Sequence, residues 1–272
     1  MTNETMTDLA RRALAVNDAF FALGNERLEA EGGTFVINRE VPIIWDANHV
    51  TAITASTAAE IERLLERAER EFEGLRHRRF DVDFRTPPEF EARMALDGYE
   101  RRELLLLLLE GEPAGEAQPI EVREVTDEAA WRRYSALNDL DSAEYGEKLP
   151  DYSPEVARYL LLLRQRRSPP VRHWLAVEDG APRAYLSSWA GVDGVGFLED
   201  LFTQVEYRRR GLASALIRHC VAEVRREGAG PVVIGADPLD TPKRMYAALG
   251  FRPVATVRGY LKRLEERADA RR

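Results

Sequence analysis

The stretch that decides the fold runs from Leu198 to Ile217 and reads LEDLFTQVEYRRRGLASALI. It begins as a strand, passes through a basic turn, and opens an amphipathic helix at Gly211. Glycine frees the turn to take left-handed dihedral angles, and the small Ala213 and Ser214 let an anion approach the backbone N–H groups. Three consecutive arginines add positive charge at the same point: Arg208, Arg209 and Arg210. We therefore expect a strand–turn–helix unit that binds a phosphate group.

The residues on both sides of this unit continue an α/β pattern. Strands are predicted at 120–125, 174–177, 184–189, 196–203, 232–236 and 254–261. Helices are predicted from Asp127 through Leu137, over 154–166, over 211–227 and over 242–249. The polar run Asn138–Pro154 is predicted as a long loop. The short connections favour a mixed, mostly antiparallel sheet flanked by helices.

The first half of the chain follows the same order of elements. A strand is predicted at 43–54, a helix at 58–73, a strand at 80–84, a helix at 87–96 and a strand at 104–109. The pairs Gly98-Tyr99 and Gly250-Phe251 close the matching helices 152 positions apart, which is a domain-scale repeat. We infer a tandem duplication; the alternative is two unrelated α/β halves that share a common local pattern.

A stretch rich in glycine, proline and glutamate, residues 110–119, separates the halves and has no large apolar residue to pack. It predicts a first domain over 1–112, a linker over 113–119, a second domain over 120–264 and a charged tail over 265–272. We interpret this stretch as an interdomain linker.

Two short motifs in the second half carry a family resemblance. Arg208–Ala213 reads RRRGLA and resembles the Arg/Gln-x-x-Gly-x-Gly/Ala signature of the GNAT acetyltransferase superfamily, placed after a strand and opening a helix. About 35 residues later, Tyr246–Phe251 reads YAALGF and is similar to a second motif of that family. The resemblance covers about Gln118 to Leu264. It departs at Asp237–Asp240, where the family commonly has an asparagine.

The resemblance implies a GNAT-like acyl-CoA acyltransferase fold in two tandem copies, with acetyl-coenzyme A (acetyl-CoA) as co-substrate. It implies that pantetheine pairs with the backbone of 201–203 and that main-chain N–H groups of 209–214 hold the pyrophosphate. The implied coenzyme-binding residues are Leu201, Phe202, Thr203, Arg208, Arg209, Arg210, Gly211, Leu212, Ala213 and Ser214.

The implied reaction is direct acetyl transfer to an amine, without a covalent enzyme intermediate. An alkyl amine with a pKa of about 10 is mostly protonated at pH 7, so a base must remove a proton. Glu199 is the first candidate and its neighbour Asp200 the second, because adjacent strand side chains face opposite ways; a base elsewhere, or water, stays open. Tyr246 would protonate the departing thiolate or donate a hydrogen bond to it, unless it only packs. The backbone around Leu201 would polarise the thioester carbonyl.

The first half lacks both chemical elements. Shifting Arg208–Ala213 back by 154 positions reaches Thr54–Ala59, which has neither arginine nor glycine, and shifting Tyr246 by 152 reaches Met94. We therefore expect a degenerate copy that lost coenzyme A binding and walls the acceptor cleft. Its one polar cluster near a strand, Asp46, Asn48 and His49, is interpreted as a loop hydrogen-bond network or as acceptor contacts.

Acceptor contacts in the second half are expected in the run 138–151, because substrate contacts often lie on long polar loops. The candidates are Asp139, Asp141, Glu144 and Tyr145. Cys220, the only cysteine, is expected to be structural.

Composition excludes several classes of partner. The net charge is −8, with 14 basic and 24 acidic residues in 1–117 against 25 and 23 in 118–272, so no basic surface for nucleic acid is expected. No apolar run is long enough to span a membrane, the four histidines lack metal-ligand spacing, and no secretion signal is seen, so a cytoplasmic protein is expected. We expect an N-acetyltransferase for a small-molecule amine. The alternatives are a protein or peptide N-acetyltransferase and a non-catalytic acyl-CoA sensor, and a homodimer stays open.

Overall fold

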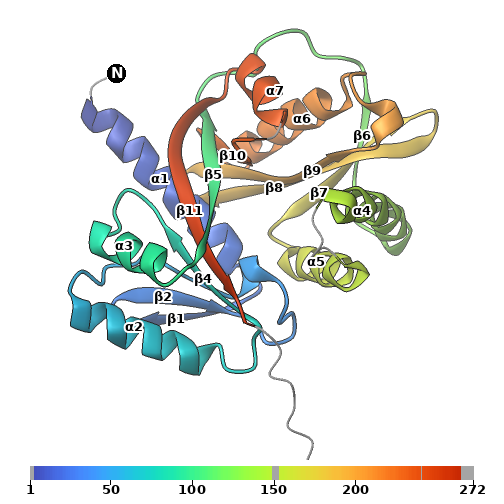
Figure 1. The fold of residues 1–272 in the computed structure, drawn as a ribbon. Coiled ribbons are helices and arrows are strands. Elements are labelled where there is room, and N and C mark those ends of the chain that lie inside the picture. The colour runs from blue at the N-terminus through green and yellow to red at the C-terminus, as the bar shows by residue number, and fades with distance from the viewer. Residues whose placement is uncertain (1–2, 149–152, 240, 265–272) are drawn as a thin grey trace, which may run out of the picture. The chain divides into compact units, whose positions relative to one another are not determined.

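The computed structural model describes residues 3–148, 153–239 and 241–264 (Figure 1). The helices are α1 (Asn3–Ala22), α2 (Ala58–Glu71), α3 (Pro88–Leu96), α4 (Glu128–Lys148), α5 (Pro154–Arg167), α6 (Leu212–Arg226) and α7 (Pro242–Ala248). The strands are β1 (Glu26–Ala30), β2 (Gly33–Ile37), β3 (His49–Thr51), β4 (His77–Val82), β5 (Glu100–Leu109), β6 (Glu121–Glu124), β7 (Arg172–Glu178), β8 (Ala181–Val192), β9 (Val195–Thr203), β10 (Val232–Ala236) and β11 (Arg252–Arg263). The mixed α/β class is as predicted.

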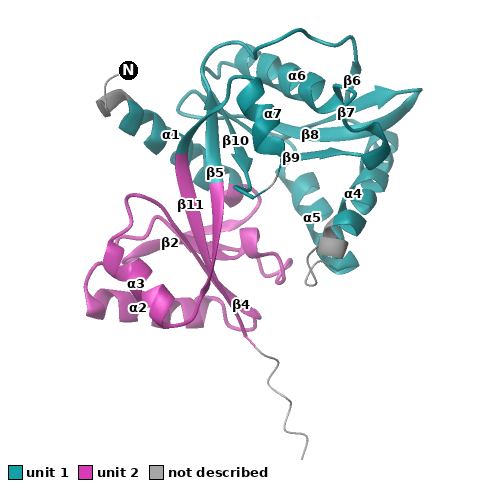
Figure 2. Ribbon diagram, turned by 45° about the horizontal axis from the view of Figure 1, so that its top comes forward, with its two compact units in different colours: residues 1–20, 105–254 teal, residues 21–104, 255–272 magenta. Residues whose placement is uncertain are grey.

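The chain divides into two compact units whose limits do not follow the sequence order (Figure 2). Unit 1 contains residues 1–20 and 105–254, and unit 2 contains residues 21–104 and the chain from 255 onward. The limits fall inside α1, inside β5 and inside β11. This division differs from the expected domains at 1–112 and 120–264, because each half of the sequence contributes part of its last strand to the other unit.

The strand pairings explain this exchange. The second part of β5, Leu105–Leu109, pairs antiparallel with β10 in unit 1. In unit 2, β11 pairs antiparallel with β4 over Arg258–Arg263. The residues of β5 that pair with β10 are all leucine, so burial in unit 1 removes a continuous apolar run from water.

The order of elements agrees with a duplication. Residue 58, where α2 begins, lies 154 positions before residue 212, where α6 begins, and α3 and α7 begin at 88 and 242, again 154 apart. The last strands begin at 100 and 252. In each half a long helix joins two parallel strands, β3 and β4 in the first and β9 and β10 in the second. The repeat inferred from the two Gly-aromatic pairs therefore holds at the level of topology.

Unit 1 also contains α1, a helix that the sequence patterns did not predict. Its last part packs Phe20 against Phe197 and Trp189, with ring centroids 4.8 and 6.2 Å away. Arg12 donates a hydrogen bond of 3.0 Å to the carbonyl oxygen of Asp193, in the β8–β9 turn. The helix therefore covers the end of the β8–β9 hairpin. No described helix of the chain is long and apolar enough to cross a membrane.

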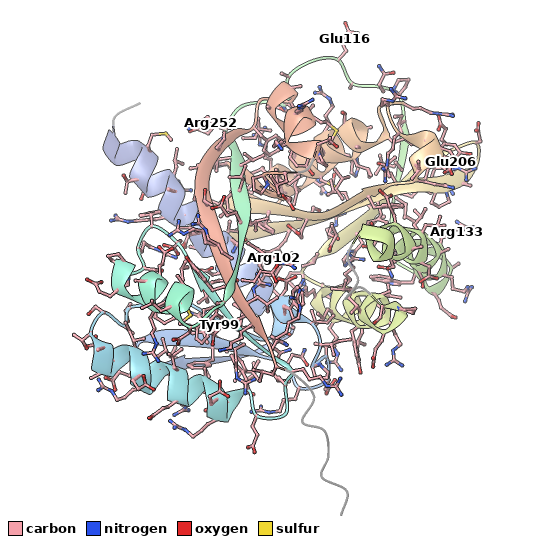
Figure 3. The ribbon with its side chains drawn as sticks, in the orientation of Figure 1. Tyr99, Arg102, Glu116, Arg133, Glu206 and Arg252 are labelled. Atoms are coloured by element: carbon pink, nitrogen blue, oxygen red, sulfur yellow. The ribbon has the colours of Figure 1, made fainter. Side chains whose placement is uncertain are left out.

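The stretch 110–119, interpreted as an interdomain linker, is packed on unit 1. Arg218 of α6 donates to the carbonyl oxygen of Pro113 at 2.7 Å, and Arg225, seven residues later on the same helix face, donates to that of Gly111 at 2.8 Å. The N–H of Ala114 donates to the carbonyl oxygen of Leu249 at 2.9 Å. Arginine side chains of α6 thus bind the backbone of a stretch that has little apolar surface of its own. The side chain of Glu116, in the same stretch, points away from unit 1 (Figure 3).

Candidate active site

The strands β9 and β10 are paired only at their beginnings. The paired residues are Gly196–Leu198 and Val232–Ile234. Further along, β9 remains paired with β8 through Phe202 and Thr203, while β10 pairs on its other side with β5. Within the described residues no pairing joins the two strands beyond Leu198, so the edge of β9 over 199–203 is open toward β10. An extended ligand can hydrogen-bond to such an edge as another strand would.

The turn that follows β9 has the backbone shape that the sequence predicted. A short 3-10 turn, Val205–Tyr207, leads through the arginines to Gly211, the residue that caps α6. Arg209 and Gly211 have φ angles of 62° and 86°, both left-handed. Left-handed residues at this spacing direct successive N–H groups toward one point, which is how backbone binds anions. Because Gly211 has no side chain to cap the helix, the first N–H groups of α6 are available to a ligand.

Gly211 is required in this turn for a second reason. A Cβ atom built there would lie 3.0 Å from Cγ of Gln118, in the stretch that packs on unit 1. Leu212 is buried and anchors the start of the helix, whereas Ala213 and Ser214 are half-buried and small. The residues present therefore fit a pyrophosphate held by main-chain N–H groups.

The three arginines of the turn do not all point at one ligand. Arg208 forms an ion pair with Glu144 of α4. Arg210 donates a hydrogen bond of 3.1 Å to the carbonyl oxygen of Glu206, whose side chain is labelled at this turn in Figure 3. Arg209 is exposed. The anion site is therefore defined chiefly by backbone geometry, with arginine charge as a screened addition.

A β-bulge lies in β9 where the strand opens. Glu199 is paired with Ser187 and Phe202 with Tyr185, so two residues of β9 face a single residue of β8. The first of the two, Asp200, has a φ of 62°. The bulge therefore turns the backbone at the position where the sequence analysis expected polarisation of the thioester. Glu199 is half-buried beside it.

Asp200, the second candidate base, is held in a buried ion pair. Arg164 of α5 donates to its Oδ1 atom at 2.7 Å, and Oγ of Ser187 lies 3.3 Å from its Oδ2 atom. Arg164 in turn donates to the side-chain oxygen of the buried Asn138. Burial alone would raise the pKa of Asp200, but the charge of Arg164 outweighs burial and lowers it. A carboxylate held in this way is a poor base.

Aromatic rings and a histidine surround this ion pair. The guanidinium carbon of Arg164 lies 5.4 Å from the ring centroid of Tyr185 and 5.9 Å from that of Tyr134. Nε2 of His173 lies 3.2 Å from the carbonyl oxygen of Arg164, and its Nδ1 lies 2.8 Å from Oγ of Ser187. Burial lowers the pKa of His173 to about 4, so the ring is neutral at pH 7. Since Ser187 is fully buried and the Asp200 carboxylate is bound by Arg164 and not by the histidine, these residues do not form a hydrolytic triad.

Sequence reasoning missed Arg164. The residue stands in the run RQRR at the end of α5, which looks like a solvated helix end. The position of Arg164 on the helix could have indicated its burial. Arg164 lies seven residues, about two helical turns, after the buried Ala157, so both residues lie on the same face of α5. An arginine on an apolar face requires a buried acidic partner.

Tyr246 lies in α7 and is only 4% exposed. Its ring is part of the core of unit 1, with the ring of Phe251 at 6.2 Å. The carbonyl oxygen of Tyr246 accepts the N–H of Phe251 at 3.0 Å, which closes the helix at Gly250. The second motif thus has a clear structural role, and the role of Tyr246 as an acid stays a prediction.

The predicted acceptor loop is wrong: residues 138–148 continue α4. The polar residues there misled the prediction because several are buried in polar contacts instead of exposed on a loop. Asp141 accepts a hydrogen bond from the hydroxyl of Tyr185, and burial raises the pKa of Asp141 to about 6. Asp139 is exposed, and Tyr145 lies in the same helix. Residues 149–152 lie outside the described part of the chain.

The matching position in the first half shows why that copy has no anion site. Thr57 caps α2, and its hydroxyl accepts the N–H of Glu60 at 3.3 Å. The Glu60 carboxylate in turn accepts the N–H groups of Thr57 and Ser56, both at 2.9 Å. These backbone bonds, that from Thr57 first, lower the pKa of Glu60 to about 2. The carboxylate of the protein itself therefore occupies the start of α2, where α6 leaves its N–H groups to a ligand.

The remaining polar cluster of unit 2 is a loop network, the first of the two interpretations. The side-chain amide of Asn48 donates to the carbonyl oxygens of Val41 and Ile44, both at 3.1 Å. Asp46 pairs with Arg79. His49 is buried beside them, with its pKa lowered by burial. At the position that matches Tyr246, the described core of unit 2 contains the fully buried Met94.

Comparisons with known proteins agree with this geometry. Residues 134–251 match the family described as Acetyltransferase (GNAT) family. No curated relative matches the chain. A GCN5-related N-acetyltransferase from Kribbella flavida is 19% identical, covers 96% of this chain and 97% of that chain, and superposes with a TM-score of 0.70. A functionally unknown conserved protein from Staphylococcus epidermidis is 13% identical over 89% of this chain and 96% of that chain, also with a TM-score of 0.70.

A third solved structure is a tandem GNAT protein from the clavulanic acid biosynthesis pathway. It is 19% identical, covers 75% of this chain and 69% of that chain, and has a TM-score of 0.52. At these identities the likeness to all three structures is one of fold. The chain thus contains a stretch, residues 134–251, that matches the acetyltransferase (GNAT) family, and its mixed α/β fold is that of GNAT acyltransferases, a tandem member among them.

Proposed function

We propose that unit 1 transfers the acetyl group of acetyl-CoA directly to the amine of a small molecule. The observation that carries the proposal is the open edge of β9 over 199–203, which leads directly into the uncapped turn before α6. The edge suits the amide groups of pantetheine, and the turn suits the pyrophosphate. Unit 2 has no such turn in its described residues, because Glu60 fills the start of α2. One acetyl-CoA site per chain follows.

Glu199 removes a proton from the ammonium form of the acceptor in this mechanism. It lies on β9 next to the bulge, where the thioester would be bound. We prefer it to Asp200, because the ion pair with Arg164 keeps the carboxylate of Asp200 charged and occupied. The freed amine then attacks the thioester carbon, and backbone N–H groups near Leu201 stabilise the negative charge on its oxygen.

Collapse of the tetrahedral intermediate breaks the carbon–sulfur bond, and the leaving thiolate takes a proton. We assign that proton to the hydroxyl of Tyr246, in the second half of the last helix of unit 1. The attacking nitrogen loses its second proton as the intermediate collapses, and this proton restores the hydroxyl of Tyr246. The proton taken by Glu199 returns to solvent, so one acetyl-CoA and one ammonium ion give coenzyme A, one amide and one proton. The amine acceptor and the base are parts of one hypothesis that the same assay can test.

The experiment is a thiol-release assay with acetyl-CoA and a panel of small amines. Wild-type protein is expected to release coenzyme A with at least one amine. Glu199→Gln should lower kcat about a hundredfold or more at neutral pH, and the loss should shrink as pH rises toward the pKa of the amine. Glu128→Gln, an exposed glutamate at the start of α4, is the matched control and should leave the rate unchanged.

Two outcomes would redirect the proposal. If no small amine reacts but acetyl groups appear on protein N-termini or lysines in an extract, the acceptor is a polypeptide. If the protein binds acetyl-CoA and transfers to neither class, it is a non-catalytic acyl-CoA sensor. Failure to bind acetyl-CoA in calorimetry would refute the proposal as a whole.

A further inference from the structure

The bulge of β9 has an aspartate in a backbone conformation that side chains avoid. The φ of 62° at Asp200 lies in the left-handed region, which non-glycine residues occupy at a cost. Aspartate bears this better than most residues, but nothing in its own backbone preference holds it there inside a strand. Contacts from neighbouring elements must therefore stabilise the conformation.

Those contacts converge on the carboxylate. Arg164 donates to Oδ1 at 2.7 Å and is itself 6% exposed. Ser187 lies 3.3 Å from Oδ2, but it has one proton and lies closer, at 2.8 Å, to Nδ1 of His173. Because the neutral His173 uses its proton on Nε2 to reach the carbonyl oxygen of Arg164, its Nδ1 must accept from the serine. Among the described residues, the strongest hydrogen-bond partner of the carboxylate is therefore the guanidinium of Arg164, and the charge of Arg167 adds to its attraction.

The guanidinium is fixed in turn by residues from two other elements. The side-chain oxygen of Asn138, 1% exposed on α4, accepts from its Nη1 atom. The rings of Tyr134 on α4 and Tyr185 on β8 lie on its sides. The ion pair thus ties α5 to the bulge of β9 through these neighbours, at the residue next to Glu199.

We propose that Arg164 is a positioning residue for the acetyl transfer. By holding the Asp200 carboxylate, it keeps the bulge in the conformation that directs the backbone N–H groups of this part of β9. The inference rests on the proposed function, since it assigns those N–H groups to the thioester carbonyl. A purely structural ion pair would stabilise unit 1 equally well with the backbone in an ordinary strand conformation.

The test uses glycine, which adopts a φ of 62° without strain and needs no carboxylate clamp. Three variants of the full chain are compared with wild type: Arg164→Met, Arg164→Met with Asp200→Gly, and Arg164→Met with Asp200→Ala. All three lack the ion pair, and the two double variants also lack the uncompensated buried charge. They differ in whether position 200 can keep the left-handed conformation.

The readouts are kcat and KM with acetyl-CoA and the fastest amine of the panel. Arg164→Met and the alanine double variant are expected to lose about a hundredfold in kcat, the effect of a misplaced oxyanion donor. The glycine double variant should regain at least about tenfold, with KM for acetyl-CoA within about threefold in all four proteins. Equal kcat in the two double variants, or an unchanged kcat in Arg164→Met, would overturn the proposal.

A spectroscopic arm separates this inference from the proposed function and does not need the Arg164 variants to fold. The carbonyl stretch of ¹³C-labelled acetyl-CoA is measured on wild type, Asp200→Gly and Asp200→Ala. Hydrogen bonding to the carbonyl lowers its frequency, so wild type and the glycine variant should show a lower frequency than the alanine variant. If wild type does not bind acetyl-CoA, the proposed function fails. If all three bind and show one frequency, only the role of Arg164 and Asp200 fails.

Discussion

Replacing Gly211 by alanine tests the anion-binding turn most directly, because the same helix offers a matched control. Gly228 follows the C-terminus of α6 with a φ of 101°, and a Cβ there would meet nothing within 4 Å. A left-handed alanine costs about 1–2 kcal/mol of stability, offset by less than about 1 kcal/mol through the unfolded chain. In urea unfolding, Gly211→Ala and Gly228→Ala should therefore each lower the free energy of unfolding by a similar amount, about 1 kcal/mol.

Coenzyme A binding should separate the two variants. At Gly211 the new Cβ also lies 3.0 Å from Gln118, and relief of either strain rotates the N–H groups that face the anion. One hydrogen bond to a charged group is worth about 1.5–3 kcal/mol, so the Kd for coenzyme A should rise about 10- to 150-fold in Gly211→Ala. Gly228→Ala should bind as wild type does. If calorimetry gives the same Kd for both variants while both lose stability, the turn does not bind the pyrophosphate.

Three further predictions concern stability. Thr57→Ala removes the cap of α2 and should cost about 1 kcal/mol in urea unfolding without changing the Kd for coenzyme A; a changed Kd would contradict the idea that Glu60 replaces a ligand. The pKa of Asp141 is raised to about 6, so the folded state binds more protons and its stability falls as pH rises from about 4 to 6. The free energy of unfolding of Asp141→Asn, relative to that of wild type, should therefore rise by up to about 3 kcal/mol between pH 4 and pH 7. If the difference in stability between the two proteins does not depend on pH, the burial argument is refuted. Leu107→Ala should cost about 2–5 kcal/mol and speed amide exchange in β10, although residue 107 belongs to the first half of the sequence; protection unchanged in β10 would contradict the strand exchange.

The parts of the fold that local sequence determines were predictable. The strand over 232–236 and the helices near 58, 88, 154, 212 and 242 begin where apolar periodicity, caps and prolines placed them. The turn at Gly211 was predictable because glycine can take a left-handed conformation and the small residues after it leave the backbone N–H groups accessible. Both properties can be read from the local sequence. The φ angles of the turn bear out that reasoning.

The sequence did not predict contacts between residues that lie far apart along the chain, such as strand pairings and side-chain hydrogen bonds between elements. The leucines of β5 predict a buried strand, but a continuous apolar run does not say that β10 is the partner rather than a strand of the first half. Asn138 and Asp141 read as loop residues because their partners, Arg164 and Tyr185, come from other elements. Polarity in a sequence identifies a need for hydrogen bonds, and only the fold shows whether water or protein meets that need.

The exchange of last strands has a consequence for how such a gene can change. A chain cut between the halves would yield one product with β10 lacking its antiparallel neighbour and another with β4 lacking its own, each with an unprotected strand edge open to aggregation. Deletion of the first half would therefore leave β10 without its antiparallel neighbour, whatever chemistry that half has. Substitutions at Thr57 and Glu60 leave this pairing in place, whereas loss of the strand at 105–109 removes it. The pairing by itself thus gives the second half a reason to keep residues 105–109.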